Sequence, residues 1–121
     1  MEEEIPALAL PEHFLGLHVG WSEERLLQRA EDENLRQVSS FPDEEIALRA
    51  ISETLASRQF EIHEWLSSGS RERLPRVHEC AFDVGIVARR TQTARTTRRT
   101  KVIVEPAPTP EGYVLVNAFP I

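Results

Sequence analysis

The chain has little of what holds many small proteins together by covalent bonds. Its 121 residues include a single cysteine, Cys80, so no internal disulfide can form and the fold must depend on packing. No apolar run approaches the roughly 20 residues that a membrane span needs. The first four residues, Met-Glu-Glu-Glu, lack the basic region of a secretory signal. These absences argue against a disulfide-bonded secreted scaffold and against a membrane-spanning protein, and a free cysteine suits a reducing cytosol.

The composition predicts one soluble globular domain over residues 1–121. The hydrophobic fraction is 40% and the charged fraction 28%, and the length suffices for one core but not for two. Pro6 and Pro11 predict an irregular N-terminal segment over residues 1–17. The pattern then predicts a mainly helical part over residues 18–67 and a mainly stranded part over residues 71–121.

Three helices are predicted in the first part. Ser22 can cap the first of them, which extends to about Leu35. A second begins near Asp43, because apolar residues recur after it at helical spacing. A third, shorter helix contains Trp65 and ends at the Ser-Ser-Gly-Ser loop of residues 67–70.

Three β-prone runs follow, over residues 84–87, 100–104 and 113–119. The proline-rich segment 106–112 between the last two is typical of a stiff hairpin connection. Helices first and antiparallel strands second predict an α+β domain, with its N-terminal helices packed on a curved antiparallel sheet.

The net charge of −6 is unevenly distributed. Residues 1–70 carry 15 acidic side chains against five arginines, whereas residues 71–121 carry nine basic side chains against five acidic ones. The segment 86–101 contains no acid and six cations, which are Arg89, Arg90, Arg95, Arg98, Arg99 and Lys101. Such a basic strip can attract a polyanion locally, because salt screens charges beyond about 10 Å. The alternative is a solvated, mobile loop.

Motifs for metal, phosphate-loop or serine chemistry do not occur in the sequence. Five side chains are possible metal ligands, but no recognised zinc spacing joins them: His13, His18, His63, His78 and Cys80. The run His78-Glu79-Cys80 suggests a cysteine nucleophile, although a lone cysteine among strand residues is more often a small core residue. We therefore predict neither a metal nor a cofactor.

His18 and Arg29 are the better candidates for chemistry. His18 comes just before the predicted Ser22 cap, and Arg29 lies two turns into the same helix. An imidazole can transfer protons near neutral pH, and a guanidinium can neutralise phosphoryl oxygens, so the pair can act on a phosphodiester without a metal. The alternative is a hydrogen-bonded structural histidine and an arginine in a helical salt bridge.

A family resemblance favours the catalytic interpretation. The run from Glu12 to Ser22, followed by Leu-Leu-Gln-Arg over residues 26–29, resembles the opening of the bacterial RNase A-like toxin domain. That domain occurs at the C-terminal tip of contact-dependent growth-inhibition proteins and other polymorphic toxins. Further segments agree in order, over residues 39–41, 47–51, 62–66, 84–85 and 117–120, so the resemblance covers nearly the whole chain.

The resemblance implies an RNase A-like fold without disulfides and a set of site residues. His18 and Arg29 match the catalytic positions of the family. The family usually ends in Thr-x-Tyr-Pro, and this chain has Asn117 and Phe119 at those places. Asn117 retains hydrogen-bonding capacity as a third catalytic candidate, and Phe119 can stack on a base. Arg89 and Arg90 of the basic strip are further candidates for substrate binding.

The implied function is that of a metal-independent endoribonuclease toxin. The 2′-hydroxyl of the RNA attacks the adjacent phosphorus and leaves a 2′,3′-cyclic phosphate, with His18 as base or acid and His13 or His63 as a possible partner. The resemblance also implies a cognate immunity protein, export within a larger toxin, action in the target-cell cytoplasm, and a monomeric free toxin. Two alternatives stay open. One is a weak or inactive relative that binds RNA or a protein, and the other is an interaction domain that docks through its acidic helices.

Overall fold

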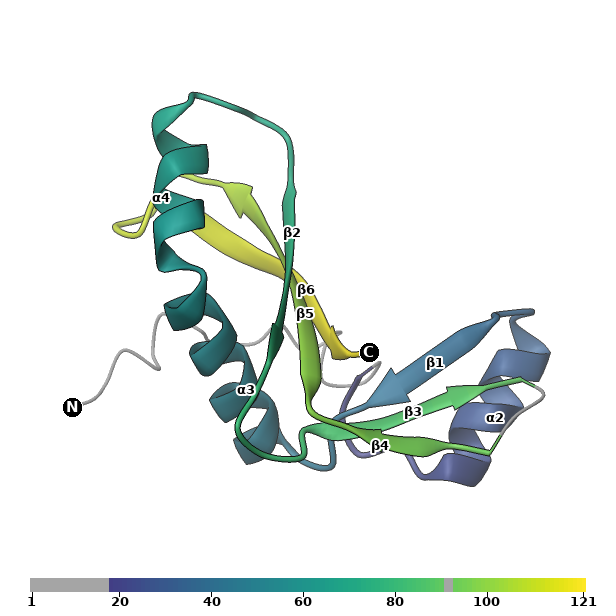
Figure 1. The fold of residues 1–121 in the computed structure, drawn as a ribbon. Coiled ribbons are helices and arrows are strands. Elements are labelled where there is room, and N and C mark those ends of the chain that lie inside the picture. Colours follow the sequence, from purple (N-terminus) through teal and green to yellow (C-terminus); the bar gives the residue numbers. More distant parts are fainter. Residues whose placement is uncertain (1–17, 91–92) are drawn as a thin grey trace.

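The fold has two halves, each made of helix packed on a three-stranded sheet (Figure 1). The computed structural model describes residues 18–90 and 93–121. In the α2 half, helix α2 (Glu23–Asp32) packs on a sheet of order β1-β3-β4, formed by Gln37–Ser40, Gly85–Arg89 and Arg95–Thr97. In the α3 half, helices α3 (Glu44–Ser57) and α4 (Gln59–Ser67) accompany a sheet of order β2-β5-β6, formed by Leu74–Glu79, Arg99–Pro106 and Tyr113–Pro120.

All strand pairs in these sheets are antiparallel. The α+β class predicted from the sequence is therefore confirmed, although the strands form two sheets and not one curved sheet. Among the residues described, no helix is both long enough and apolar enough to cross a membrane.

Helices α2 and α3 begin at side-chain caps, and the Ser22 cap confirms the prediction for the first helix. The Ser22 side chain accepts a hydrogen bond from the backbone N–H of Arg25 at 3.2 Å, and the Asp43 side chain accepts one from Ile46 at 2.8 Å. Helix α2 ends at Asp32, earlier than the predicted Leu35. Asn34, with a φ of 55°, adopts the left-handed conformation there, which asparagine tolerates better than most residues and which stops the helix.

Strands β1, β2 and β4 were not predicted from the sequence. Strand β1 lies between two helices, so the expected order of helices first and strands second is wrong at this point. Its Gln-Val-Ser-Ser sequence has a weak β signal, and it is a strand because it pairs with β3 over residues 86–89. Strand β4 lies inside the basic strip, so much of that strip is sheet and not a loop.

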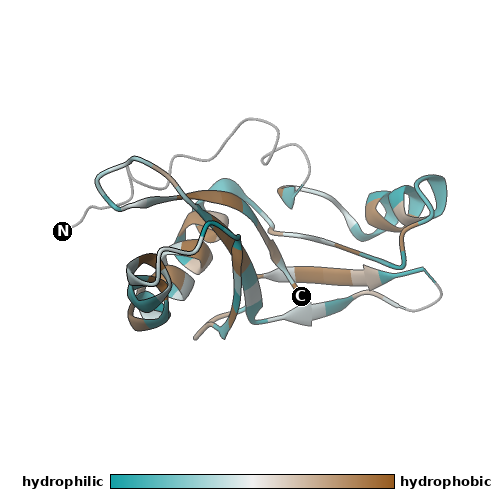
Figure 2. Ribbon diagram, turned by 90° about the horizontal axis from the view of Figure 1, so that it is seen from above, coloured by the Kyte–Doolittle hydropathy of each residue, from teal (hydrophilic) through white to brown (hydrophobic). Residues whose placement is uncertain are grey.

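The two halves have cores of different size. The larger core gathers residues of α3, α4 and the β2-β5-β6 sheet, together with Phe41 and Val84 near the junction of the halves. The smaller core contains four buried residues, Leu26, Ala30, Val38 and Ala88. Figure 2 shows apolar stretches in both sheets, whereas α2 is largely hydrophilic.

The single cysteine belongs to the larger core. Cys80 is 3% exposed, and burial raises the pKa of its thiol, so a role as a core residue is confirmed and a reactive thiolate is not favoured.

The halves meet where β1, β3 and β6 converge. A Cβ atom on Gly85 would lie 2.2 Å from the carbonyl oxygen of Ser40 and 2.9 Å from Cγ of Pro120, so only glycine fits. A short parallel bridge lies nearby, in which the N–H of Phe41 donates to the carbonyl oxygen of His18 at 2.8 Å. This bridge places His18 beside the junction.

The β2-β5-β6 sheet has one face toward α3 and one face away from it. Thr100, Val102 and Val104 of β5 are buried on the α3 side. Because side chains alternate along a strand, Lys101 and Ile103 point to the opposite side, here called the outer face. Lys101 pairs directly with Phe119 and Ile103 with Asn117, so these two β6 residues share the outer face.

Candidate active site

His18 lies against the C-terminal strand. Its ring is stacked on that of Phe119, with 5.6 Å between the ring centroids and an interplanar angle of 29°. The histidine is half-buried, and its Nδ1 atom is buried. Two residues that are 101 positions apart in the sequence thus meet on the outer face of the β2-β5-β6 sheet. An imidazole held in this way presents a group for proton transfer beside an aromatic platform.

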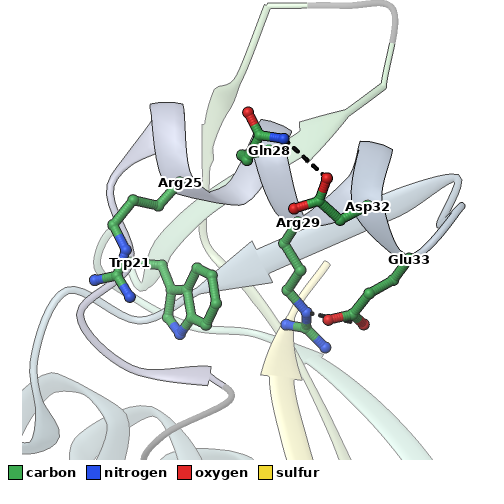
Figure 3. A pocket seen from close by; sticks show the side chains of 6 residues that line it. All are labelled: Trp21, Arg25, Gln28, Arg29, Asp32 and Glu33. Carbon is green, nitrogen blue, oxygen red and sulfur yellow. Dashed lines mark hydrogen bonds and ion pairs between the residues drawn. The ribbon is translucent and has the colours of Figure 1, made fainter.

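Arg29 belongs to a cluster of side chains along α2. Its guanidinium lies 5.4 Å from the ring centroid of Trp21, and that of Arg25 lies 4.6 Å from the same centroid. Arg29 also forms an ion pair with Glu33 at 3.4 Å, and its side chain is only 14% exposed. The indole of Trp21 therefore lies between two cations (Figure 3).

These residues line a hollow of about 230 Å³ on α2. Gln28, Asp32 and Glu33 complete its wall (Figure 3), so the hollow contains both signs of charge. The ion pair and the indole fix the guanidinium of Arg29, and a fixed, planar cation suits a phosphate ligand.

Asn117 shares the outer face with Phe119, two residues along β6. Its Oδ1 atom accepts a hydrogen bond from the backbone N–H of Ala118 at 2.9 Å, which orients the amide. The amide NH₂ group is a donor that remains available for a further hydrogen bond to a base or a phosphate oxygen.

The structure places Arg89 and Arg90 at some distance from this junction. Both are exposed. Arg89 is the last residue of β3 and pairs with Gln37, four residues from Gly85, or about 13 Å along an extended strand, and Arg90 follows it. Arg90 donates to the side chain of Asn34, just beyond α2. The two arginines therefore do not join His18 and Phe119, and as substrate-binding residues they would serve a more distant part of a polyanion.

His63, which the sequence offered as a possible acid–base partner, does not join His18 on the outer face either. His63 is exposed on α4, where it is hydrogen-bonded to Gln59 at 2.7 Å. Helix α4 packs on the α3 side of the sheet, since its Glu61 pairs with Arg76 at 2.5 Å, and Arg76 faces that side together with Val102. His13 lies outside the described residues.

One group of possible metal ligands comes together, although no sequence spacing connects it. Single ligand atoms of Glu53, His78 and Cys80 lie within 4.8 Å of one another on the α3 side of the sheet. Glu53 and His78 form an ion pair at 2.9 Å, and Glu53 also accepts from the N–H of Ala81. These contacts tie β2 to α3, on the face opposite to Phe119.

The sequence did not single out Trp21, nor did it reveal the pairing of Lys101 with Phe119. Trp21 precedes Arg25 and Arg29 by four and eight residues, a helical spacing that would have indicated the stack. Lys101 carried a weaker signal, because its place opposite Phe119 depends on a strand register that the sequence does not reveal.

The geometry defines a disulfide-free α+β domain in which the His18 imidazole is stacked against the C-terminal strand. Comparison with known proteins gives a domain class of the same kind. Residues 12–120 match the sequence model of the bacterial CdiA-CT RNAse A domain. The chain belongs to this family. No curated protein sequence matches the chain.

A solved structure is similar over almost its whole length. It is the crystal structure of a CdiA-CT/CdiI complex from Y. kristensenii, with a TM-score of 0.83 and 27% sequence identity. The match covers 90% of this chain and 98% of the other. The chain is therefore a CdiA-CT toxin domain of the RNase A class, and such domains form the C-terminal toxin region of CdiA proteins.

Proposed function

We propose that this domain is a metal-independent endoribonuclease that cleaves RNA by attack of the 2′-hydroxyl. The observation that supports the proposal most directly is the His18 imidazole stacked on Phe119, in a chain of the RNase A family. His18 is half-buried and supported from both sides, by the Phe119 ring and by the bridge to Phe41, so its imidazole is held in place.

The proposed reaction balances without a co-reactant. The 2′-oxygen forms a bond to phosphorus and loses its proton, while the bond from phosphorus to the 5′-oxygen breaks and that oxygen gains a proton. The products are a 2′,3′-cyclic phosphate and a 5′-hydroxyl. His18 exchanges a proton with one of the two oxygens, and Phe119, which lacks a hydroxyl, supplies a stacking surface and no proton.

Arg29 and Asn117 have supporting roles in this proposal. Negative charge on the non-bridging oxygens grows as the 2′-oxygen attacks, and the fixed guanidinium of Arg29 stabilises that charge. The Asn117 amide donates to a base edge or to a phosphate oxygen. Only RNA carries the 2′-hydroxyl, so RNA and not DNA is the proposed substrate.

Cleavage of RNA in the presence of EDTA tests the proposal. The proteins compared are the unmodified chain, His18→Ala, and the matched control His63→Ala, which removes an exposed histidine on the other side of the sheet. We expect His18→Ala to lose about 10²- to 10⁴-fold in rate, as is usual for a general acid or base, and His63→Ala to lose nothing.

Two results would contradict the proposal. One is equal cleavage by His18→Ala and the unmodified chain, and the other is loss of all cleavage in EDTA. If the unmodified chain binds RNA and never cleaves it, the domain is a binding module, as the replacement of the family's Thr and Tyr by Asn117 and Phe119 would allow.

We extend the proposal to a partner and a place of action. The matched structure is a complex of CdiA-CT with a second chain, CdiI. A cell that makes a ribonuclease must protect its own RNA, so we propose a cognate immunity protein that blocks access of RNA to the site. Within this proposal the domain is exported as part of a larger toxin, acts in the cytoplasm of the target cell and is monomeric when free.

A further inference from the structure

One cation of the outer face has no role in the site described so far. Lys101 is the only lysine of the chain. It is half-buried in the middle of the sheet, directly opposite Phe119 of β6 on one side and Val77 of β2 on the other. Its ammonium group is therefore carried on a flexible stem between two apolar neighbours.

This position brings Lys101 close to the proposed catalytic histidine. Directly paired residues of an antiparallel sheet have their Cα atoms about 4.5–5.5 Å apart, and their side chains emerge side by side on one face. The ring of Phe119 is in turn stacked on His18. Phe119 thus has Lys101 as its cross-strand neighbour and His18 as its ring partner.

Among the described residues, Lys101 has no counter-charge of the kind that Arg98 and Arg73 have. Arg98 pairs with Asp83 at 3.0 Å and Arg73 with Glu105 at 2.9 Å. In the described part of the chain, no ion pair or side-chain hydrogen bond involves Lys101. A half-buried ammonium without a carboxylate partner retains its full attraction for an anionic ligand.

We propose that Lys101 binds the phosphate of the RNA at the place where His18 meets Phe119. This inference rests on the proposed ribonuclease function and adds a contact to the reacting group. The ammonium approaches a non-bridging phosphoryl oxygen, where negative charge increases during attack by the 2′-hydroxyl. A cation on that oxygen stabilises the transition state more than the bound substrate.

Lys101 then complements Arg29 from the other half of the molecule. The guanidinium of Arg29 is held by Glu33 and Trp21 on α2, whereas Lys101 comes from the β2-β5-β6 sheet. The two proposed phosphate-binding cations therefore come from different halves of the molecule.

The test compares three variants with the unmodified chain on a short RNA substrate. Lys101→Met removes the charge and retains an unbranched stem, Lys101→Arg restores a cation, and Arg71→Met removes an exposed cation from the segment between α4 and β2 as the control. We expect kcat/KM to fall about 10²- to 10³-fold in Lys101→Met, and to stay within about tenfold in Lys101→Arg, with no change for Arg71→Met. Equal kcat/KM for Lys101→Met and the unmodified chain overturns the catalytic contact, provided that thermal melts show both to be folded.

A binding measurement separates this inference from the ribonuclease proposal. A 2′-deoxy oligonucleotide of the same sequence cannot be cleaved, and its affinity falls with salt in proportion to the phosphates contacted. Loss of one phosphate contact makes the negative slope of log K against log salt shallower by about 0.7 for a single strand. Lys101→Met should show that decrease and Arg71→Met should not, even if the unmodified chain cleaves no RNA. An unchanged slope in Lys101→Met overturns the phosphate contact itself, whether or not the protein is a ribonuclease.

Discussion

The α2 half and the α3 half each carry residues of the proposed function, but the apolar packing inside the two halves differs greatly in amount. Among residues 18–90 and 93–121, the larger core has eleven buried residues, and the smaller core has the four residues Leu26, Ala30, Val38 and Ala88. His18, Phe119 and Lys101 lie on or against the sheet supported by the larger core. Arg29 is carried by α2, above the smaller one.

This difference has an energetic consequence. Burial of one Leu-sized side chain contributes roughly 1.5–3 kcal/mol, and two of the four residues in the smaller core are alanines. We therefore expect the local free energy of opening to be lower for the α2 half than for the α3 half. The well-packed sheet would then hold the imidazole in place, while the more easily opened helix carries Arg29. This arrangement suits the entry of a large polymer.

The largest loss of stability is expected from Gly85→Ala at the junction of the halves. The new Cβ would lie 2.2 Å from the Ser40 carbonyl oxygen, and a backbone atom cannot yield as a flexible side chain can. We expect a loss of about 3 kcal/mol or more in the free energy of unfolding. Denaturant titration measures it, with Gly69→Ala as the control.

Gly69 is also a glycine with positive φ, but nothing lies within 4 Å of the position of its added Cβ. Gly69→Ala should therefore show only the cost of a strained turn, about 1 kcal/mol. Equal losses in the two variants would mean that the backbone of β1 at Ser40 does not approach Gly85 closely enough to exclude a Cβ atom.

The second prediction compares equivalent deletions in the two cores. Ile51→Ala and Leu26→Ala each remove a fully buried aliphatic side chain, and each should destabilise its own surroundings by about 2–5 kcal/mol. The Cys80 thiol, 3% exposed in the larger core and with its pKa raised by burial, reports opening of that core through alkylation at mildly alkaline pH. Ile51→Ala should accelerate alkylation strongly, and Leu26→Ala should leave it nearly unchanged.

Hydrogen exchange measures local opening of the α2 half, which Cys80 does not report. Leu26→Ala should lower protection in α2, β1 and β3 without lowering it in β5 and β6. If both variants accelerate Cys80 alkylation equally, the two halves unfold as one cooperative unit and the proposed difference between them does not exist.

The smallest effect is expected from removal of a helix cap in each half. Ser22→Ala and Asp43→Ala each delete one side-chain hydrogen bond at the start of a helix, and each should cost about 1 kcal/mol. Because α2 carries Arg29, Ser22→Ala should also reduce the rate of RNA cleavage, whereas Asp43→Ala should change stability alone. If Asp43→Ala lost more cleavage activity than Ser22→Ala, the assignment of Arg29 and α2 to the proposed reaction would be wrong.

The helices could be predicted from the sequence because their signals are local. Ser22 caps the helix that it was expected to cap, and the second helix begins near Asp43, as expected. The three strands of residues 84–87, 100–104 and 113–119 correspond to β3, β5 and β6. Strand β1 escaped prediction because its four residues become a strand only through pairing with a segment about 50 residues away.

The site residues likewise fall into those that the sequence could indicate and those that only the fold brings together. His18 and Phe119 were indicated by the family resemblance, and their ring contact is a fact of the fold that no periodicity could reveal. Arg89 and Arg90 looked like part of one basic surface, but the alternation of strand residues and the length of β3 carry them away from the junction. Lys101, within the same strip, is brought to Phe119 by register alone.

The nature of the cleavage product tests the central proposal most directly. A short RNA with one scissile bond is incubated with the unmodified chain in EDTA, and the new ends are identified by mass spectrometry. We expect a 2′,3′-cyclic phosphate on one fragment and a 5′-hydroxyl on the other, with no cleavage when the 2′-hydroxyl at that bond is replaced by hydrogen. A 5′-phosphate, or cleavage of the 2′-deoxy bond, would show that water and not the 2′-hydroxyl attacks, and would contradict it.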